Sequence, residues 1–93
     1  MSQVAPEAIP VIPRGVRLHR DEVREQWVLL APERAVALDQ VGYAILSEID
    51  GTRSFGAITE GLAEAYAAPL EQIVADAGEF LRGLMDRRIL EEA

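Results

Sequence analysis

The sequence contains no cysteine and no lysine. Without cysteine it can form no disulfide, no thiolate metal site and no iron–sulfur cluster, and it has no thiol nucleophile. Without lysine it cannot form a Schiff base with a carbonyl substrate. These two absences exclude several classes of metal-dependent and covalent catalysis.

Basic charge is also scarce. The chain has 16 Asp and Glu residues against 9 arginines, which gives a net charge of −7. An acidic surface repels phosphate, so binding to nucleic acid or to an anionic membrane is disfavoured. No apolar run approaches the ~20 residues that span a bilayer. Residues 1–13 lack the basic start and apolar stretch of a signal peptide, so we expect a soluble cytoplasmic protein.

The chain is short, with 93 residues of which 49% are apolar. That is enough for one domain with one core, because a chain of this size buries somewhat over ~60% of its unfolded surface. It leaves no room for a deep catalytic pocket beside the core.

Prolines interrupt the N-terminal segment at Pro6, Pro10 and Pro13. Each proline fixes φ and removes a backbone donor. We therefore expect an extended, mobile tail over residues 1–13 and a folded domain over residues 14–93. The apolar pair Val11–Ile12 leaves open that the tail docks on its own domain or on a neighbour.

Residues 16–38 are predicted to form three strands. Apolar and polar residues alternate from Val16, and a continuous apolar run at residues 27–31 is typical of a central strand. After a break at Pro32, a third strand is predicted over Arg34–Leu38. These strands predict an antiparallel meander whose third strand is an edge.

Three helices are predicted to follow. Asp39 and Ser54 are good N-caps for the first two, and Pro69 suits the first position of the third. The apolar residues with helical spacing are Val41, Ile45, Ile49, Ile58, Leu62, Ala65, Tyr66, Leu70, Ile73, Val74, Ala77, Leu81 and Leu84. A last short strand is expected at residues 89–90. Strands followed by helices indicate an α+β fold of winged-helix-like architecture.

Few side chains could carry chemistry. His19 has no second His or Cys as a partner, so a polar strand residue is the simpler interpretation. Asp76 and Glu79 lie one helical turn apart and could bind a metal or act as acid and base, but in so acidic a chain a solvated helix face is the preferred interpretation. Trp27 is expected in the core, with stacking on a ligand as the alternative, and Phe80 suits either core or groove. We expect no catalytic residue, metal or organic cofactor.

An ordered set of segments runs through the chain from Arg14 onward. The set comprises Arg14–Leu18, Asp21, Trp27–Glu33, Leu38–Asp39, Asp50–Gly51, Ile58, Leu62, Tyr66, Pro69, Ile73, Asp76, Phe80, Leu81 and Leu84. In this order it resembles the PqqD family of pyrroloquinoline quinone biosynthesis. Three positions depart from the resemblance: Gly42 stands where Ala is expected, Ala57 lacks the acidic half of a capping box, and Arg88 replaces a common Gly.

The resemblance implies a function. PqqD-like proteins bind a ribosomal precursor peptide, PqqA, and present it to a radical S-adenosylmethionine enzyme, PqqE, which cross-links a Glu and a Tyr within the peptide. The same fold serves as the leader-peptide recognition element of other peptide-modifying systems. The iron–sulfur chemistry would belong to the partner enzyme, in agreement with the absence of cysteine in this chain.

A domain without a deep pocket can bind an extended peptide by adding it as a strand to a sheet edge. The predicted edge is Arg34–Leu38, and the third helix is the wall of the groove. The predicted peptide-binding residues are Arg34, Ala35, Val36, Ala37, Leu38, Ile73, Asp76, Ala77 and Phe80. An open edge also permits exchange of strands between chains. We therefore expect a monomer, or a weak or strand-exchanged homodimer.

A winged-helix DNA-binding protein is the alternative function. Its third helix would enter the major groove. From residue 70 to residue 88 that helix carries four carboxylates against three arginines, a net charge of −1. The segment also lacks Lys, Asn, Ser and Thr for contacts to phosphates and bases, which disfavours this alternative.

Overall fold

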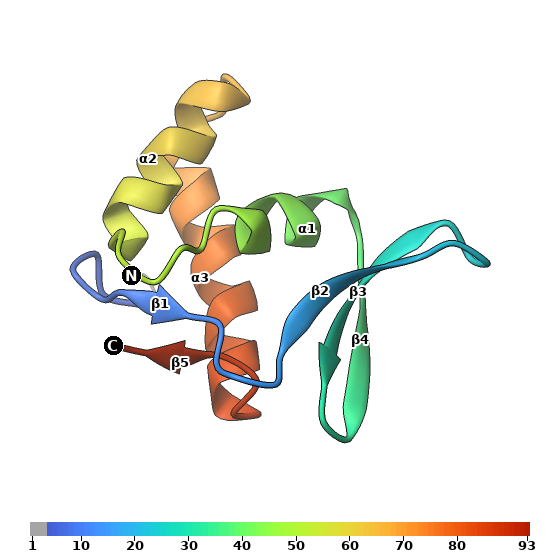
Figure 1. The fold of residues 1–93 in the computed structure, drawn as a ribbon. Helices are drawn as coiled ribbons and strands as arrows, with labels where there is room; N and C mark the ends of the chain where they lie inside the picture. The colour runs from blue at the N-terminus through green and yellow to red at the C-terminus, as the bar shows by residue number, and fades with distance from the viewer. Residues whose placement is uncertain (1–3) are drawn as a thin grey trace.

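The computed structural model describes residues 4–93, with a three-stranded antiparallel sheet followed by three helices, as predicted. Figure 1 shows the sheet on one side of the long helix α3, with α1 between α3 and the sheet and α2 beside the upper half of α3 on the other side. The elements of this body are β2 (Arg17–Asp21), β3 (Gln26–Ala31), β4 (Arg34–Leu38), α1 (Gln40–Ser47), α2 (Phe55–Ala65) and α3 (Leu70–Asp86). The fold class is α+β.

The sheet has the order β2-β3-β4, with both pairs antiparallel. Its central strand is β3, in agreement with the continuous apolar run that predicted it, and Leu29 of this strand is fully buried. The register aligns Trp27 with Leu38 and Ala31 with Arg34. Consequently β2 and β4 are both edge strands, each with one side open to a further strand.

The helix starts follow from local hydrogen bonds. The Asp39 carboxylate accepts from the Gly42 N–H at 2.7 Å, and the Ser54 hydroxyl accepts from the Ala57 N–H at 3.2 Å. Both residues are the N-caps that the sequence predicted. Pro69 differs by one position: its extended backbone makes it the residue before α3, which begins at Leu70.

The core lies between the helices and the sheet. Its most buried large side chains are Leu29, Leu46, Phe55, Ile58, Leu81, Ile89 and Leu90. Three apolar residues predicted on helix stripes are instead exposed: Val41 by 61%, Tyr66 by 64% and Leu70 by 43%. Val41 and Leu70 lie in the first turn of α1 and α3, and Tyr66 is the residue that follows α2, so all three stand at helix ends.

The segment 4–13 differs from the expected mobile tail. Val4 is fully buried, and the carbonyls of Pro6 and Ala8 accept hydrogen bonds from α2 backbone amides at 2.8 and 2.7 Å. The two-residue strand β1 (Pro10–Val11) pairs antiparallel with β5 (Glu91–Glu92). Docking on its own domain, one of the two possibilities left open, is thus the arrangement of residues 4–13. Residues 1–3 of the expected tail lie outside the described residues.

The C-terminal strand lies two residues later than predicted. Ile89 and Leu90, which were expected to form it, are only 2% exposed and pack into the core. They follow a left-handed residue, Arg88, with a φ of 62°. The chain therefore turns sharply after α3, buries this apolar pair, and then pairs as β5 with the N-terminal segment (Figure 1).

Candidate functional site

The open edge of β4 is the first part of the candidate site. Its five residues have the predicted bounds, Arg34–Leu38. The side chain of Leu38 is buried and that of Val36 is half-buried, while Arg34, Ala35 and Ala37 are exposed. The strand therefore turns one face toward the core, and its free edge is accessible for pairing.

The hairpin between β3 and β4 determines which backbone groups of β4 are free. Its loop has two residues, and Ala31 pairs with Arg34. The residues that flank such a loop form a hydrogen-bonded pair, and hydrogen-bonded pairs alternate along an antiparallel ladder. The backbone of Val36 therefore bonds to β3. The N–H and C=O groups of Ala35 and Ala37 face the open edge.

A small hollow of about 390 Å³ lies between β4 and the C-terminal half of α3. Val36 and Phe80 line it together, so the structure joins a predicted strand residue to a predicted helix residue. The remaining lining residues are Glu79, Arg82, Gly83, Leu84, Asp86 and Arg87. The sequence reasoning missed most of these, although Gly83 lies one turn after Phe80 and leaves that part of the α3 face open.

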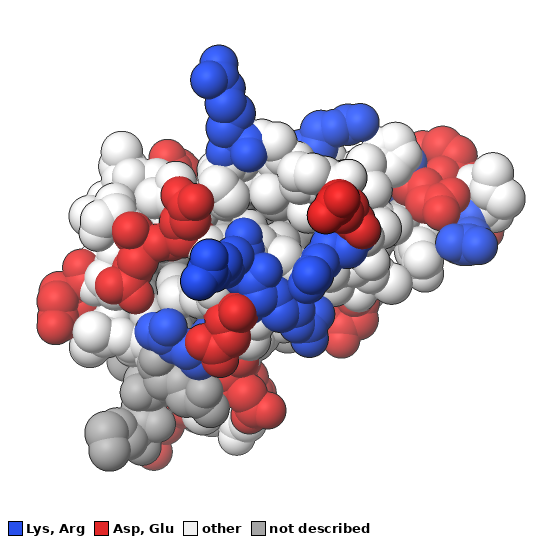
Figure 2. All heavy atoms as spheres, turned by 90° about the horizontal axis from the view of Figure 1, so that it is seen from below, with Lys and Arg blue, Asp and Glu red and all other residues white. Residues whose placement is uncertain are grey.

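The charges around the small hollow are mixed. Glu79 and Asp86 stand beside Arg82 and Arg87, and Arg82 lies 3.7 Å from the Glu92 carboxylate. Figure 2, seen from below the view of Figure 1, shows arginine side chains gathered near the middle of that face, with carboxylates around them. This end of the molecule can receive polar groups of either sign beside an apolar strip.

A larger groove of about 870 Å³ lies next to the small hollow. Its walls are formed by the β2–β3 hairpin, by α1, and by the C-terminal end of α2 together with the N-terminal half of α3. Leu38, Ile73, Asp76 and Ala77, all predicted peptide-binding residues, line it. The predicted set is therefore divided between two hollows, and Arg34, Ala35 and Ala37 line neither of them.

Phe80 lines the small hollow and lies near Leu38, which lines the larger groove. A β-carbon built on Gly42 would lie 3.2 Å from the Phe80 ring and 3.6 Å from Leu38. The ring thus packs where α1 begins and β4 ends. The sequence had left core and groove open for Phe80, and the structure gives it both, because it packs on the core and lines the small hollow.

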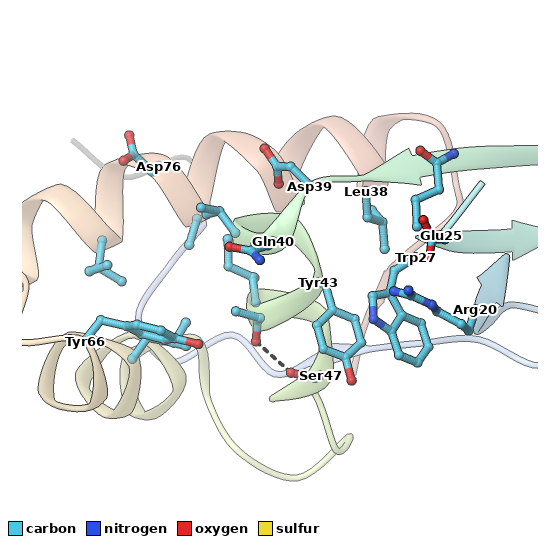
Figure 3. A pocket seen from close by; sticks show the side chains of 17 residues that line it. Arg20, Glu25, Trp27, Leu38, Asp39, Gln40, Tyr43, Ser47, Tyr66 and Asp76 are labelled. Carbon is cyan, nitrogen blue, oxygen red and sulfur yellow. Dashed lines mark hydrogen bonds between the residues drawn. The ribbon is translucent and has the colours of Figure 1, made fainter. Parts of the chain in front are cut away.

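Asp76 is exposed at the rim of the larger groove, where Figure 3 shows it on α3 above the groove. Its carboxylate accepts a hydrogen bond from the Gln72 side-chain amide at 3.0 Å. A carboxylate has two oxygens and about four acceptor sites, so this single bond leaves Asp76 able to accept from a partner.

Trp27 is only partly in the core. Its ring packs against the core cluster but is half-buried and lines the larger groove. It stacks on Tyr43, with ring centroids 4.3 Å apart and planes at 18°, and Arg20 lies 5.9 Å from the ring centroid (Figure 3). Sequence periodicity could not identify Tyr43, because it lies off the apolar stripe of Ile45.

Among residues 4–93, no three His, Cys, Asp or Glu side chains lie close enough to share a metal ion. His19 is exposed on β2 and lines neither hollow. The same residues include no helix long and apolar enough to cross a membrane. The site offers an open strand edge, apolar walls and polar rims, which are features of peptide or protein recognition.

Comparison with protein families supports this interpretation. The family model for coenzyme PQQ synthesis protein D (PqqD) matches residues 26–90. The chain belongs to the PqqD family. A protein of Rhizobium meliloti (strain 1021) named PqqA binding protein is 44% identical over 88 residues, which are 95% of this chain and 90% of that protein. A PqqA binding protein of Bradyrhizobium diazoefficiens is 45% identical over 90% of this chain and 82% of its own length.

Two solved PqqD structures share the fold. The solution structure of the PqqD truncation of Methylobacterium extorquens PqqCD, described as a functional and stand-alone RiPP recognition element, has a TM-score of 0.82 at 42% identity. The alignment covers 95% of this chain and 94% of that one. A crystal structure of PqqD from Xanthomonas campestris has a TM-score of 0.61 at 38% identity, over 95% and 98% of the two chains.

Proposed function

We propose that this PqqD-family chain binds the precursor peptide PqqA as a strand added to β4 and presents it to the radical S-adenosylmethionine enzyme PqqE in the cytoplasm. The observation that carries the proposal is the open edge of β4 beside a hollow on α3, in which Val36 and Phe80 form an apolar strip and charged side chains form the rest of the lining. This is the geometry of peptide recognition by strand addition. The names of the relatives, PqqA binding protein, support the choice of peptide.

Backbone pairing alone does not account for such a complex. About four hydrogen bonds along β4, at roughly 0.5–1.5 kcal/mol net each, fall short of the ~8 kcal/mol of a micromolar complex. Apolar peptide side chains must therefore be buried as well. The small hollow between Val36 and Phe80 supplies a place for one of them, and α3 forms its wall.

The chain acts in this proposal by binding and not by catalysis. Its role is to hold the peptide for an enzyme that has its own cofactor. DNA binding finds no support in the geometry, because α3 itself carries four carboxylates against one arginine, Arg82, and phosphate contacts need cationic side chains.

A titration of ¹⁵N-labelled protein with synthetic PqqA tests the binding step. We expect the largest amide shifts at Ala35, Ala37 and residues 77–84. Shifts confined to α1 and α2, with residues 34–38 unchanged, would contradict the proposed position of the peptide. No shift at saturating peptide would contradict peptide binding itself.

A reconstituted reaction tests presentation. PqqE should cleave S-adenosylmethionine at the same rate with and without this chain, because that step does not involve the peptide. Cross-linking of PqqA should fall sharply when the chain is omitted. Equal cross-linking in both mixtures would refute the presenting role.

A further inference from the structure

The larger groove has the character of an interaction surface. Its floor and walls are largely apolar, and two of its lining residues, Val41 and Tyr66, are 61% and 64% exposed. Leu70, 43% exposed, lies three residues before the lining residue Ile73 on α3. Exposed apolar side chains are common singly, but a group of them around one hollow marks a binding site.

The groove is separate from the open edge of β4. Leu38 is the one β4 residue that lines it, and α1 forms much of its wall. Ala35 and Ala37, whose backbone groups face the open edge, line no part of it. A strand added along β4 would therefore leave the walls made by α1 and α2 uncovered, so a peptide and a second partner can be bound together.

The charges at the groove indicate what that partner presents. Three carboxylates line it, those of Glu25, Asp39 and Asp76, against one arginine, Arg20. Arg20 lies over the ring of Trp27 at 5.9 Å, so its charge is turned to an aromatic face of this chain. A partner that complements the groove carries basic side chains at its edges.

Stacked aromatic rings form one wall. Trp27 and Tyr43 lie with their planes at 18°, and Figure 3 shows both rings at the end of the groove formed by the sheet, with Tyr66 at the opposite end. Trp, Tyr and Arg are the residue types that contribute most to binding in protein interfaces. All three are present here on rigid elements, which favours a protein surface as the occupant.

We propose that the larger groove docks the peptide-modifying enzyme, through an apolar surface segment flanked by Lys or Arg side chains. This inference rests on the proposed function, since a presenting protein must hold its peptide and its enzyme at the same time. It assigns the peptide to the β4 edge and the enzyme to the Trp27–Tyr43–Tyr66 groove.

The sequence provides two reporters for a direct test. Trp27 is the only Trp, so its indole N–H gives a single NMR signal from within the groove. The amides of Ala35 and Ala37 report on the strand edge. With ¹⁵N-labelled protein, we expect unlabelled PqqE to shift or broaden the indole signal, and PqqA peptide to shift the two edge amides.

Matched substitutions at exposed positions separate docking from folding. Tyr66→Ser removes an exposed aromatic of the groove, and Val23→Ser, at a position 94% exposed on the β2–β3 hairpin, is its control. Glu25→Arg reverses a rim charge, and Glu22→Arg reverses an exposed charge of the same hairpin outside the groove. We expect each groove variant to weaken PqqE binding by about tenfold or more. The control variants should stay within about twofold of the parent.

The outcomes separate this inference from the proposed function. If PqqA shifts the edge amides but Tyr66→Ser and Glu25→Arg bind PqqE as the parent does, the docking surface is wrong and the peptide-binding role stands. If PqqA leaves the edge amides unchanged, the proposed function fails instead. If PqqA itself shifts the indole and Tyr66→Ser weakens peptide binding, the groove belongs to the peptide and the inference is overturned. Absence of any PqqE binding overturns it too.

Discussion

Phe80 of α3 lies directly against Gly42 of α1, so that a β-carbon at residue 42 would come within 3.2 Å of the Phe80 Cζ atom. This separation is shorter than side-chain carbons ordinarily adopt. The absence of a side chain at Gly42 is thus what allows the ring to pack at the end of β4. It gives a physical reason for a glycine at a helical position where alanine is the expected residue.

The effect of Gly42→Ala should depend on Phe80. Alanine in a helix is favoured over glycine by roughly 0.5–1 kcal/mol, but here the new methyl group crowds the ring and the Asp39 carboxylate, also 3.2 Å away. We expect Gly42→Ala to be neutral or destabilising in the parent and stabilising in a Phe80→Ala background. Urea unfolding of the parent, the two single variants and the double variant measures the coupling free energy between residues 42 and 80, which we expect to be about 0.5 kcal/mol or more. If the changes in unfolding free energy of the two single variants add up to that of the double variant, the contact does not contribute as described.

The sequence predicted the elements whose causes are local. The bounds of β4 follow from the break at Pro32 and the cap at Asp39, and the start of α2 follows from Ser54. The central position of β3 follows from its apolar run. Each of these features depends on residues within a few positions of one another, which is why a single sequence was enough.

Contacts between distant parts of the chain were not predictable. The proline spacing of residues 4–13 is compatible with a tail in solvent and with a docked segment, and the decision depends on contacts with Phe55 and Gly56. The division of the predicted site into two hollows results from packing between distant elements, in which Phe80 of α3 lies against Gly42 of α1. The half-exposed face of Trp27 likewise results from the hairpin extending beyond the core.

Val4 should contribute to stability although it lies near the N-terminus. Its side chain is fully buried in the core. Val4→Ala removes two methyl groups, each worth about 0.8 kcal/mol when buried, so we expect the free energy of unfolding to fall by roughly 1.5 kcal/mol. Ala5→Gly, at an exposed neighbouring position, is the control. An effect of Val4→Ala near zero would support a mobile tail in solution.

Asp50 should make the free energy of unfolding depend on pH in the range below the ordinary pKa of an aspartate. Backbone N–H groups of Arg53 and Thr52 donate to its carboxylate, and the pKa of Asp50 is held well below its ordinary value of 3.8. A lowered folded-state pKa stabilises the fold above the unfolded pKa and loses this effect as the pH falls toward the folded value.

We therefore expect Asp50→Asn to lower the Tm at pH 7, and we expect the difference from the parent to shrink as the pH falls below about 4. Thermal melts from pH 2 to pH 7 measure this. Glu60→Gln, at an exposed position on α2, controls for the general loss of a negative charge. A difference that is constant with pH would mean that the charge of Asp50 does not contribute.

Two open sheet edges make self-association testable. Both β2 and β4 have one unpaired side. The turn between β2 and β3 contains the left-handed residue Glu25, and opening of this turn would release β2 for exchange with a second chain. We expect a monomer in dilute solution and a weak or strand-exchanged dimer only at high concentration. Light scattering over a dilution series measures this, and a tight dimer at low micromolar concentration would contradict it.

Proline substitutions along β4 should distinguish its two sides. The N–H of Ala37 faces the open edge, so Ala37→Pro removes a donor for the peptide while the pairing with β3 remains, a position where edge strands tolerate proline. The N–H of Val36 faces β3, so Val36→Pro should disrupt the sheet itself.

We expect Ala37→Pro to keep its fold, as judged by circular dichroism and thermal melting. It should bind PqqA about tenfold or more weakly, because it loses a hydrogen bond and the ring obstructs the added strand. Ala37→Ser retains the N–H and should bind as the parent does. If Ala37→Pro folds and binds with unchanged affinity, the peptide does not pair with β4.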